Sequence, residues 1–102
     1  MSLRYTVAVE PLTKEQERIF REYVVSNGGT WWHWISNFWL VKFPSETEIS
    51  AEMIWNELIK LNPEARVYID SVKHTEWTVT DIQKGKSRMA AWLEKHWMDD
   101  ED

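Results

Sequence analysis

The chain has 102 residues, 12 basic against 17 acidic side chains, a net charge of -5 and no cysteine. This length suits one domain with a single core, and the missing cysteines exclude disulfides, thiolate metal sites and cysteine nucleophiles. The last four residues are all acidic, so the rest is nearly neutral and a strongly cationic nucleic-acid surface is not expected. No apolar run approaches the roughly 20 residues of a membrane helix and no secretory leader is visible, so we expect a soluble cytoplasmic protein without membrane contact.

The N-terminal part predicts a strand followed by a helix. Residues 4–9 alternate between apolar and polar side chains, as a half-buried strand does, and Pro11 ends the run. Thr13 and Gln16 form a capping box, in which each side chain satisfies a free backbone donor of the first helical turn. Apolar residues at helical spacing follow, and the Asn-Gly-Gly at 27–29 stops the helix.

A tryptophan-rich hairpin comes next. Residues 30–35 and 38–43 are rich in aromatic and β-branched side chains, which favour strands. Ser36 and Asn37 between them suit a tight turn. The chain contains eight tryptophans, and four of them lie in this hairpin, which makes it the most informative segment.

The C-terminal half repeats the alternation of helix and strand. Ser45 and Glu48 resemble another capping box and predict a helix that ends at 62–63, before a strand over 66–72. A short strand over 76–80 and a helix over 81–97 complete the list, the helix starting from a third capping box at Thr80 and Gln83. We therefore predict one α+β domain over 1–98 and a disordered acidic tail over 99–102.

The order of elements is typical of the ferredoxin-like (βαββαβ) fold, an antiparallel sheet with two helices on one face. A two-residue turn would place Trp32, Trp34, Trp39, Val41 and Phe43 toward the helices. The open face would then carry a surface for a partner: Trp31, His33, Phe38 and Leu40 of the hairpin, with Tyr68 of the strand over 66–72.

Such an apolar open face needs a cover. The C-terminal helix, a second copy of the chain or the bases of single-stranded nucleic acid would each serve. The near-neutral charge disfavours nucleic acid, so the C-terminal helix and a homodimer are the favoured alternatives.

In the hairpin, Trp-His-Trp-Ile at 32–35 and Trp-Leu-Val at 39–41 follow a glycine at position 29. This pattern resembles the central signature of SinR-like proteins, relatives of the small CRISPR-associated adaptation nuclease and the VapD toxins. The resemblance spans residues 4–72 and implies a ferredoxin-like homodimer. In the nuclease members, an aspartate at the end of the first strand pairs with its dimer mate and holds a divalent metal ion. That position corresponds to Glu10.

Glu10 is therefore the candidate catalytic and metal-binding residue, with Mg²⁺ or Mn²⁺ as cofactor, and His33 is a second catalytic candidate. The chain departs from the family pattern at this position, where glutamate replaces aspartate, and in the helix over 81–97, which has no counterpart in the minimal family. These departures bear on catalysis more than on the fold. We expect a homodimeric, non-catalytic interaction or scaffold module. The alternative is a metal-dependent endoribonuclease with Glu10 paired across the dimer.

Overall fold

The computed structural model describes residues 2–72 and 92–97 of the chain. The predicted strand over 76–80, most of the predicted last helix and the acidic tail lie outside these described residues. None of the described helices is long and apolar enough to cross a membrane. The expected cytoplasmic location stays a prediction.

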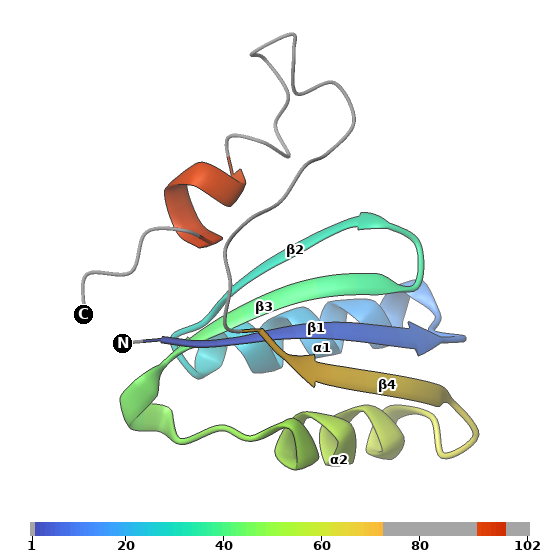
Figure 1. Cartoon of the computed structure of the whole chain (residues 1–102). Coiled ribbons are helices and arrows are strands. Elements are labelled where there is room, and N and C mark those ends of the chain that lie inside the picture. Colours follow the sequence, from blue (N-terminus) through green and yellow to red (C-terminus); the bar gives the residue numbers. More distant parts are fainter. Residues whose placement is uncertain (1, 73–91, 98–102) are drawn as a thin grey trace, which may run out of the picture.

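The described residues form an antiparallel sheet with helices (Figure 1). In chain order, the elements are β1 (Ser2–Glu10), α1 (Lys14–Ser26), β2 (Thr30–Ile35), β3 (Phe38–Pro44), the 3₁₀ turn η1 (Ser45–Thr47), α2 (Ala51–Leu61), β4 (Arg66–Ser71) and the short helical segment η3 (Leu93–Trp97). The four strands have the spatial order β2-β3-β1-β4, and each pairs antiparallel with its neighbours. The predicted α+β class, the antiparallel sheet and the first four strands are confirmed.

The first helix follows its capping signals closely. The Thr13 side chain accepts from the backbone N–H of Gln16, and the Gln16 side chain accepts from the N–H of Thr13, which completes the predicted capping box. The helix ends at Asn27, and Gly28 follows with a φ of 76°, a conformation that glycine adopts without strain.

The second helix begins later than predicted. The sequence placed its cap at Ser45, but that residue starts the turn η1, and Glu48 adopts a left-handed conformation with a φ of 55°. The cap is instead Ser50, whose hydroxyl accepts from the backbone N–H of Met53. The predicted box at Ser45 and Glu48 is therefore wrong, because a left-handed residue interrupts the helical path.

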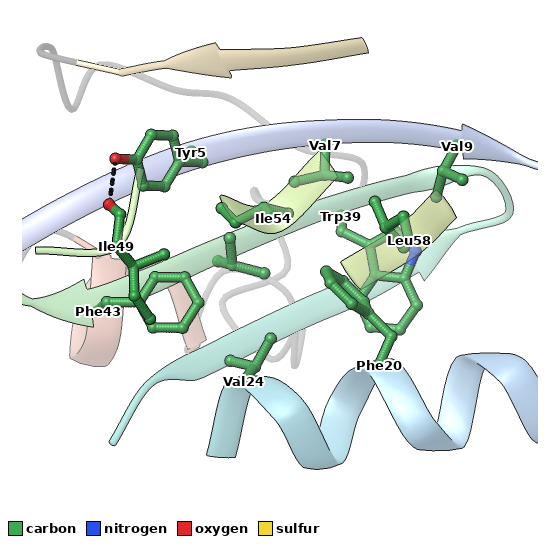
Figure 2. Packing of buried hydrophobic residues seen from close by; sticks show 11 residues of the cluster. Tyr5, Val7, Val9, Phe20, Val24, Trp39, Phe43, Ile49, Ile54 and Leu58 are labelled. Atoms are coloured by element: carbon green, nitrogen blue, oxygen red, sulfur yellow. Dashed lines mark hydrogen bonds between the residues drawn. The ribbon is translucent and has the colours of Figure 1, made fainter. Parts of the chain in front are cut away.

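The core lies between one face of the sheet and the two α-helices. Alternate residues of β1 and β3 point toward α1 and α2 (Figure 2). The buried cluster consists of Tyr5, Val7, Val9, Phe20, Val24, Trp39, Val41, Phe43, Ile49, Ile54 and Leu58. The large ring of Trp39 is fully buried and meets Phe20 edge-on at 4.9 Å between ring centroids.

Candidate functional site

The β2–β3 hairpin departs from the predicted register. Ile35 pairs with Phe38 as expected, but the next pair is Trp32 with Leu40. β2 therefore carries one residue more than β3 between these two pairs, which is a β-bulge. A shift of one residue moves every side chain beyond it to the other face of the sheet.

The predicted placement of Trp31 and His33 on the open face is wrong because of this bulge. Trp31 pairs with Val41 and packs against the core. The ring of His33 stacks on the buried Trp39, with centroids 3.8 Å apart and planes at 5°. Trp32, which was predicted to face the helices, lies on the opposite face with Leu40. The side chain of Trp34 lies outside the described part of the structure.

The His33 side chain is held on both of its ring nitrogens. Nδ1 donates to the carbonyl oxygen of Phe38 at 3.0 Å, and Nε2 lies 3.3 Å from a carboxylate oxygen of Glu17 on α1. Only 12% of the side chain is exposed. These contacts join the hairpin to α1 and are those of a structural histidine. No contact between His33 and Glu10 is present among the described residues, so the two catalytic candidates do not form one site within a chain.

The Glu10 carboxylate lies at the end of β1 and is engaged by two neighbours. Oε2 accepts from Nη2 of Arg66 on β4 at 2.7 Å, and Oε1 accepts from the side-chain amide of Asn37 in the hairpin turn at 3.0 Å. Arg66 stands directly opposite Glu10 in the β1–β4 register. The carboxylate therefore ties the hairpin turn and β4 to the end of β1.

This environment does not fit a divalent metal site within one chain. Mg²⁺ prefers an octahedral set of oxygen ligands, whereas both Glu10 oxygens already accept hydrogen bonds, one of them from a cation. Within residues 2–72 and 92–97, no group of three or more carboxylate or histidine side chains is placed to hold a metal ion.

The sheet face opposite the α-helices carries η3 at one end. Nε of Arg4 donates to the carbonyl oxygen of Trp97 at 2.6 Å, and Nζ of Lys42 donates to that of His96 at 2.5 Å. Figure 1 shows η3 on the side of the strands away from α2. Trp32 on the same face is also buried. η3 thus covers part of the face. Whether the whole predicted helix over 81–97 covers it stays a prediction, because most of that helix lies outside the described residues.

The other end of this face is apolar, with Ile35 and Tyr68 exposed and Ala8 and Phe38 half-buried. We define the exposed patch as Ala8, Ile35, Phe38 and Tyr68, which come from the four strands. Ala8 pairs with both Phe38 and Tyr68, and Phe38 pairs with Ile35, so the four side chains share one face. Tyr68 is 64% exposed and Ile35 is 56% exposed. Leu40, the remaining predicted surface residue, is half-buried farther along β3.

A shallow hollow of about 450 Å³ adjoins the patch. Its lining includes Ala8 and Tyr68 of the patch together with Glu10, Asn37 and Arg66. The hollow therefore combines an aromatic wall with a polar rim of amide, carboxylate and guanidinium groups. Of the predicted site residues, Glu10 and Tyr68 line it, whereas Trp31 and His33 lie on the other side of the sheet.

Sequence reasoning missed the two partners of Glu10. Arg66 and Asn37 are distant from Glu10 in the chain, and neither carries a motif. Pairing the predicted strands over 4–9 and 66–72 antiparallel would have placed Arg66 opposite Glu10, because Arg66 begins one strand and Glu10 follows the end of the other. The position of Asn37 follows only from the folded hairpin.

Comparisons with known proteins leave the family open. No protein-family model matches the chain, and no curated protein or solved structure is significantly similar to it.

Proposed function

We propose that the chain is a non-catalytic interaction module with a ferredoxin-like fold, and that it acts as a homodimer joined through the exposed patch. The order of elements and the two helices on one face of the antiparallel sheet support the fold. The relationship to SinR-like proteins is part of the same proposal and rests on the resemblance over residues 4–72, in which the hairpin carries the most specific pattern.

The exposed patch is the observation that carries the proposal. Aromatic and aliphatic side chains that share one face of a sheet bury a large apolar area when a partner covers them. The ion pair of Glu10 and Arg66 beside the patch is neutral overall, so it adds no net repulsion between two copies. A two-fold axis through the patch would place the same side chains against each other, as in an isologous dimer.

The endoribonuclease alternative is less well supported. A metal ion shared between two Glu10 residues would have to displace Arg66 and Asn37 from the carboxylate. His33 could not assist, since its ring is stacked on the other side of the sheet. An assay on labelled single-stranded RNA, with Mg²⁺, Mn²⁺ or chelator, distinguishes the alternatives. Metal-dependent cleavage that Glu10→Ala abolishes would replace our proposal with the nuclease.

Sedimentation velocity over a range of concentrations tests the proposed dimer. We expect the wild type to dimerise and Tyr68→Glu to weaken the dimer by at least about tenfold, because a carboxylate would be buried at the interface. Trp55→Glu is the matched control, since Trp55 is an exposed aromatic residue on α2, 44% exposed. It should dimerise like the wild type.

Two results would refute the dimer. One is a wild-type monomer up to about 1 mM, which would mean an association free energy weaker than about -4 kcal/mol. The other is an equal effect of Tyr68→Glu and Trp55→Glu, which would show that the charge and not its position matters.

A further inference from the structure

A second surface lies on the other side of the molecule, between α1 and β2. We define the α1–β2 groove by the residues that line it: Arg18, Arg21, Glu22, Val25, Ser26 and Trp31. The groove has a volume of about 510 Å³. Val25 forms an apolar part of its wall and is largely exposed.

Arg21 is the distinctive group of this groove. Its guanidinium carbon lies 5.5 Å from the centre of the Trp31 ring, within the range of a cation–π contact. Among the described residues, Arg21 has no hydrogen bond or ion pair. The guanidinium therefore lies over the ring while its N–H groups remain available to an anion.

The second arginine of the groove is already neutralised. Arg18 forms ion pairs with Glu15 and Glu22 along α1. The hydrogen bond from Arg18 lowers the pKa of Glu15 below its usual value, so this carboxylate stays charged. The groove thus offers one unpaired positive charge, on Arg21, beside apolar surface.

The groove runs beside an edge of the sheet. Within residues 2–72 and 92–97, β2 pairs with β3 alone, so its outer side carries backbone N–H and C=O groups that a further strand can bind. The bulge after Trp32 interrupts this edge, which leaves Thr30–Trp32 as its regular part. A peptide strand paired there would point alternate side chains toward α1.

We propose that the α1–β2 groove binds an extended segment of a partner protein, which pairs with the edge of β2 and places an aspartate or glutamate on Arg21. An apolar neighbour on the same face of the segment contacts Val25 and Trp31. Nucleic acid fits less well, because a chain of phosphates would meet one unpaired cation and the carboxylates of α1. The proposal is independent of the exposed patch and of the dimer.

Selection from a phage-displayed library of random linear dodecapeptides tests this proposal. The full-length chain is the bait, and the Arg21→Gln variant is used for counter-selection. We expect enriched sequences to share an acidic residue two positions from an apolar one. Synthetic peptides of these sequences should bind Arg21→Gln about tenfold to a hundredfold more weakly, the range for losing a charge-assisted hydrogen bond.

Three further measurements distinguish the proposed mode from a general charge effect. Lys60→Gln removes a positive charge from α2 and should leave the affinity unchanged. Arg21→Lys keeps the charge but lacks the planar group that stacks on Trp31, so it should bind less tightly than the wild type. Methylation of alternate backbone nitrogens of the peptide should abolish binding in one register only, as strand pairing requires.

Several outcomes would overturn the proposal. These are no enrichment over Arg21→Gln, equal affinity of the selected peptides for Arg21→Gln, or loss of affinity in Lys60→Gln as well. Binding of fluorescein-labelled oligouridylate that Arg21→Gln abolishes, without any peptide binding, would assign Arg21 to phosphate and would also overturn it.

Discussion

Replacing Tyr5 with phenylalanine removes one hydroxyl group from the core and leaves the ring in place. This hydroxyl donates to the carbonyl oxygen of Ile49 at 2.7 Å (Figure 2) and so ties β1 to the segment before α2. The two residues are 7% and 3% exposed. Because Tyr5→Phe leaves the buried carbonyl unpaired, we expect the free energy of unfolding to fall by about 1–2 kcal/mol.

Urea denaturation followed by circular dichroism measures this loss. Tyr23→Phe is the matched control, because the Tyr23 hydroxyl has no hydrogen bond within the described residues although its ring is half-buried. We expect that control to change the free energy of unfolding by less than about 0.5 kcal/mol. Equal effects of the two substitutions would refute this prediction, since the hydrogen bond from Tyr5 to the Ile49 carbonyl would then not contribute to the free energy of unfolding.

The burial of Tyr5 also makes the free energy of unfolding depend on pH. Burial raises the pKa of Tyr5 above its ordinary value of 10.0, because the phenolate is less well solvated inside the protein. In the unfolded chain the hydroxyl ionises at its ordinary pKa, so the stabilisation is complete below pH 10 and is lost as the pH rises through the higher folded-state value. The wild type should therefore lose stability more steeply than Tyr5→Phe in alkaline solution, and parallel curves would contradict this.

Substitutions at two positions, Gly29 and Asn37, test the hairpin by thermal unfolding. Gly29→Ala should lower the free energy of unfolding by about 1–3 kcal/mol, because the added Cβ would lie 2.8 Å from the backbone oxygen of Lys42; wild-type stability would show that the two strands do not approach so closely. Asn37 has a φ of 82°, so Asn37→Ala should cost about 1 kcal/mol more than Asn37→Gly. Equal melting temperatures of these two variants would argue against the left-handed turn.

Local signals predicted most of the described elements. Alternation of apolar side chains located β1 and β4 within a few residues, and aromatic and β-branched composition located β2 and β3. The capping box at Thr13 located α1, because all of these patterns act between near neighbours in the chain. The start of α2 was predicted too early, because the pattern of Ser45 and Glu48 matches a capping box although the cap is Ser50. Glu48, between Ser45 and Ser50, adopts a left-handed conformation that prevents a helix from starting at Ser45. Glutamate rarely adopts this conformation, so the residue type does not predict it.

The candidate site depended on long-range geometry that the sequence does not encode locally. The bulge in β2 contains no glycine or proline, yet it reverses the faces of Trp31 and His33. At the bulge, His33 stacks on Trp39 and lies 3.3 Å from a carboxylate oxygen of Glu17, and these contacts join the hairpin to α1. The sequence correctly placed Glu10 at the end of β1. Its contact with Arg66 depends on the pairing of β1 with β4, which the structure supplies.

We propose that the exposed patch is an interaction surface for a second copy of the chain. The most direct measurement is a dilution series of ¹H–¹⁵N correlation spectra, assigned for the whole backbone. We predict concentration-dependent shifts centred on the amides of Ala8, Phe38 and Tyr68, with those of α2 unchanged. Spectra that do not change with concentration, or shifts centred on α2, would contradict the proposed dimer through the exposed patch.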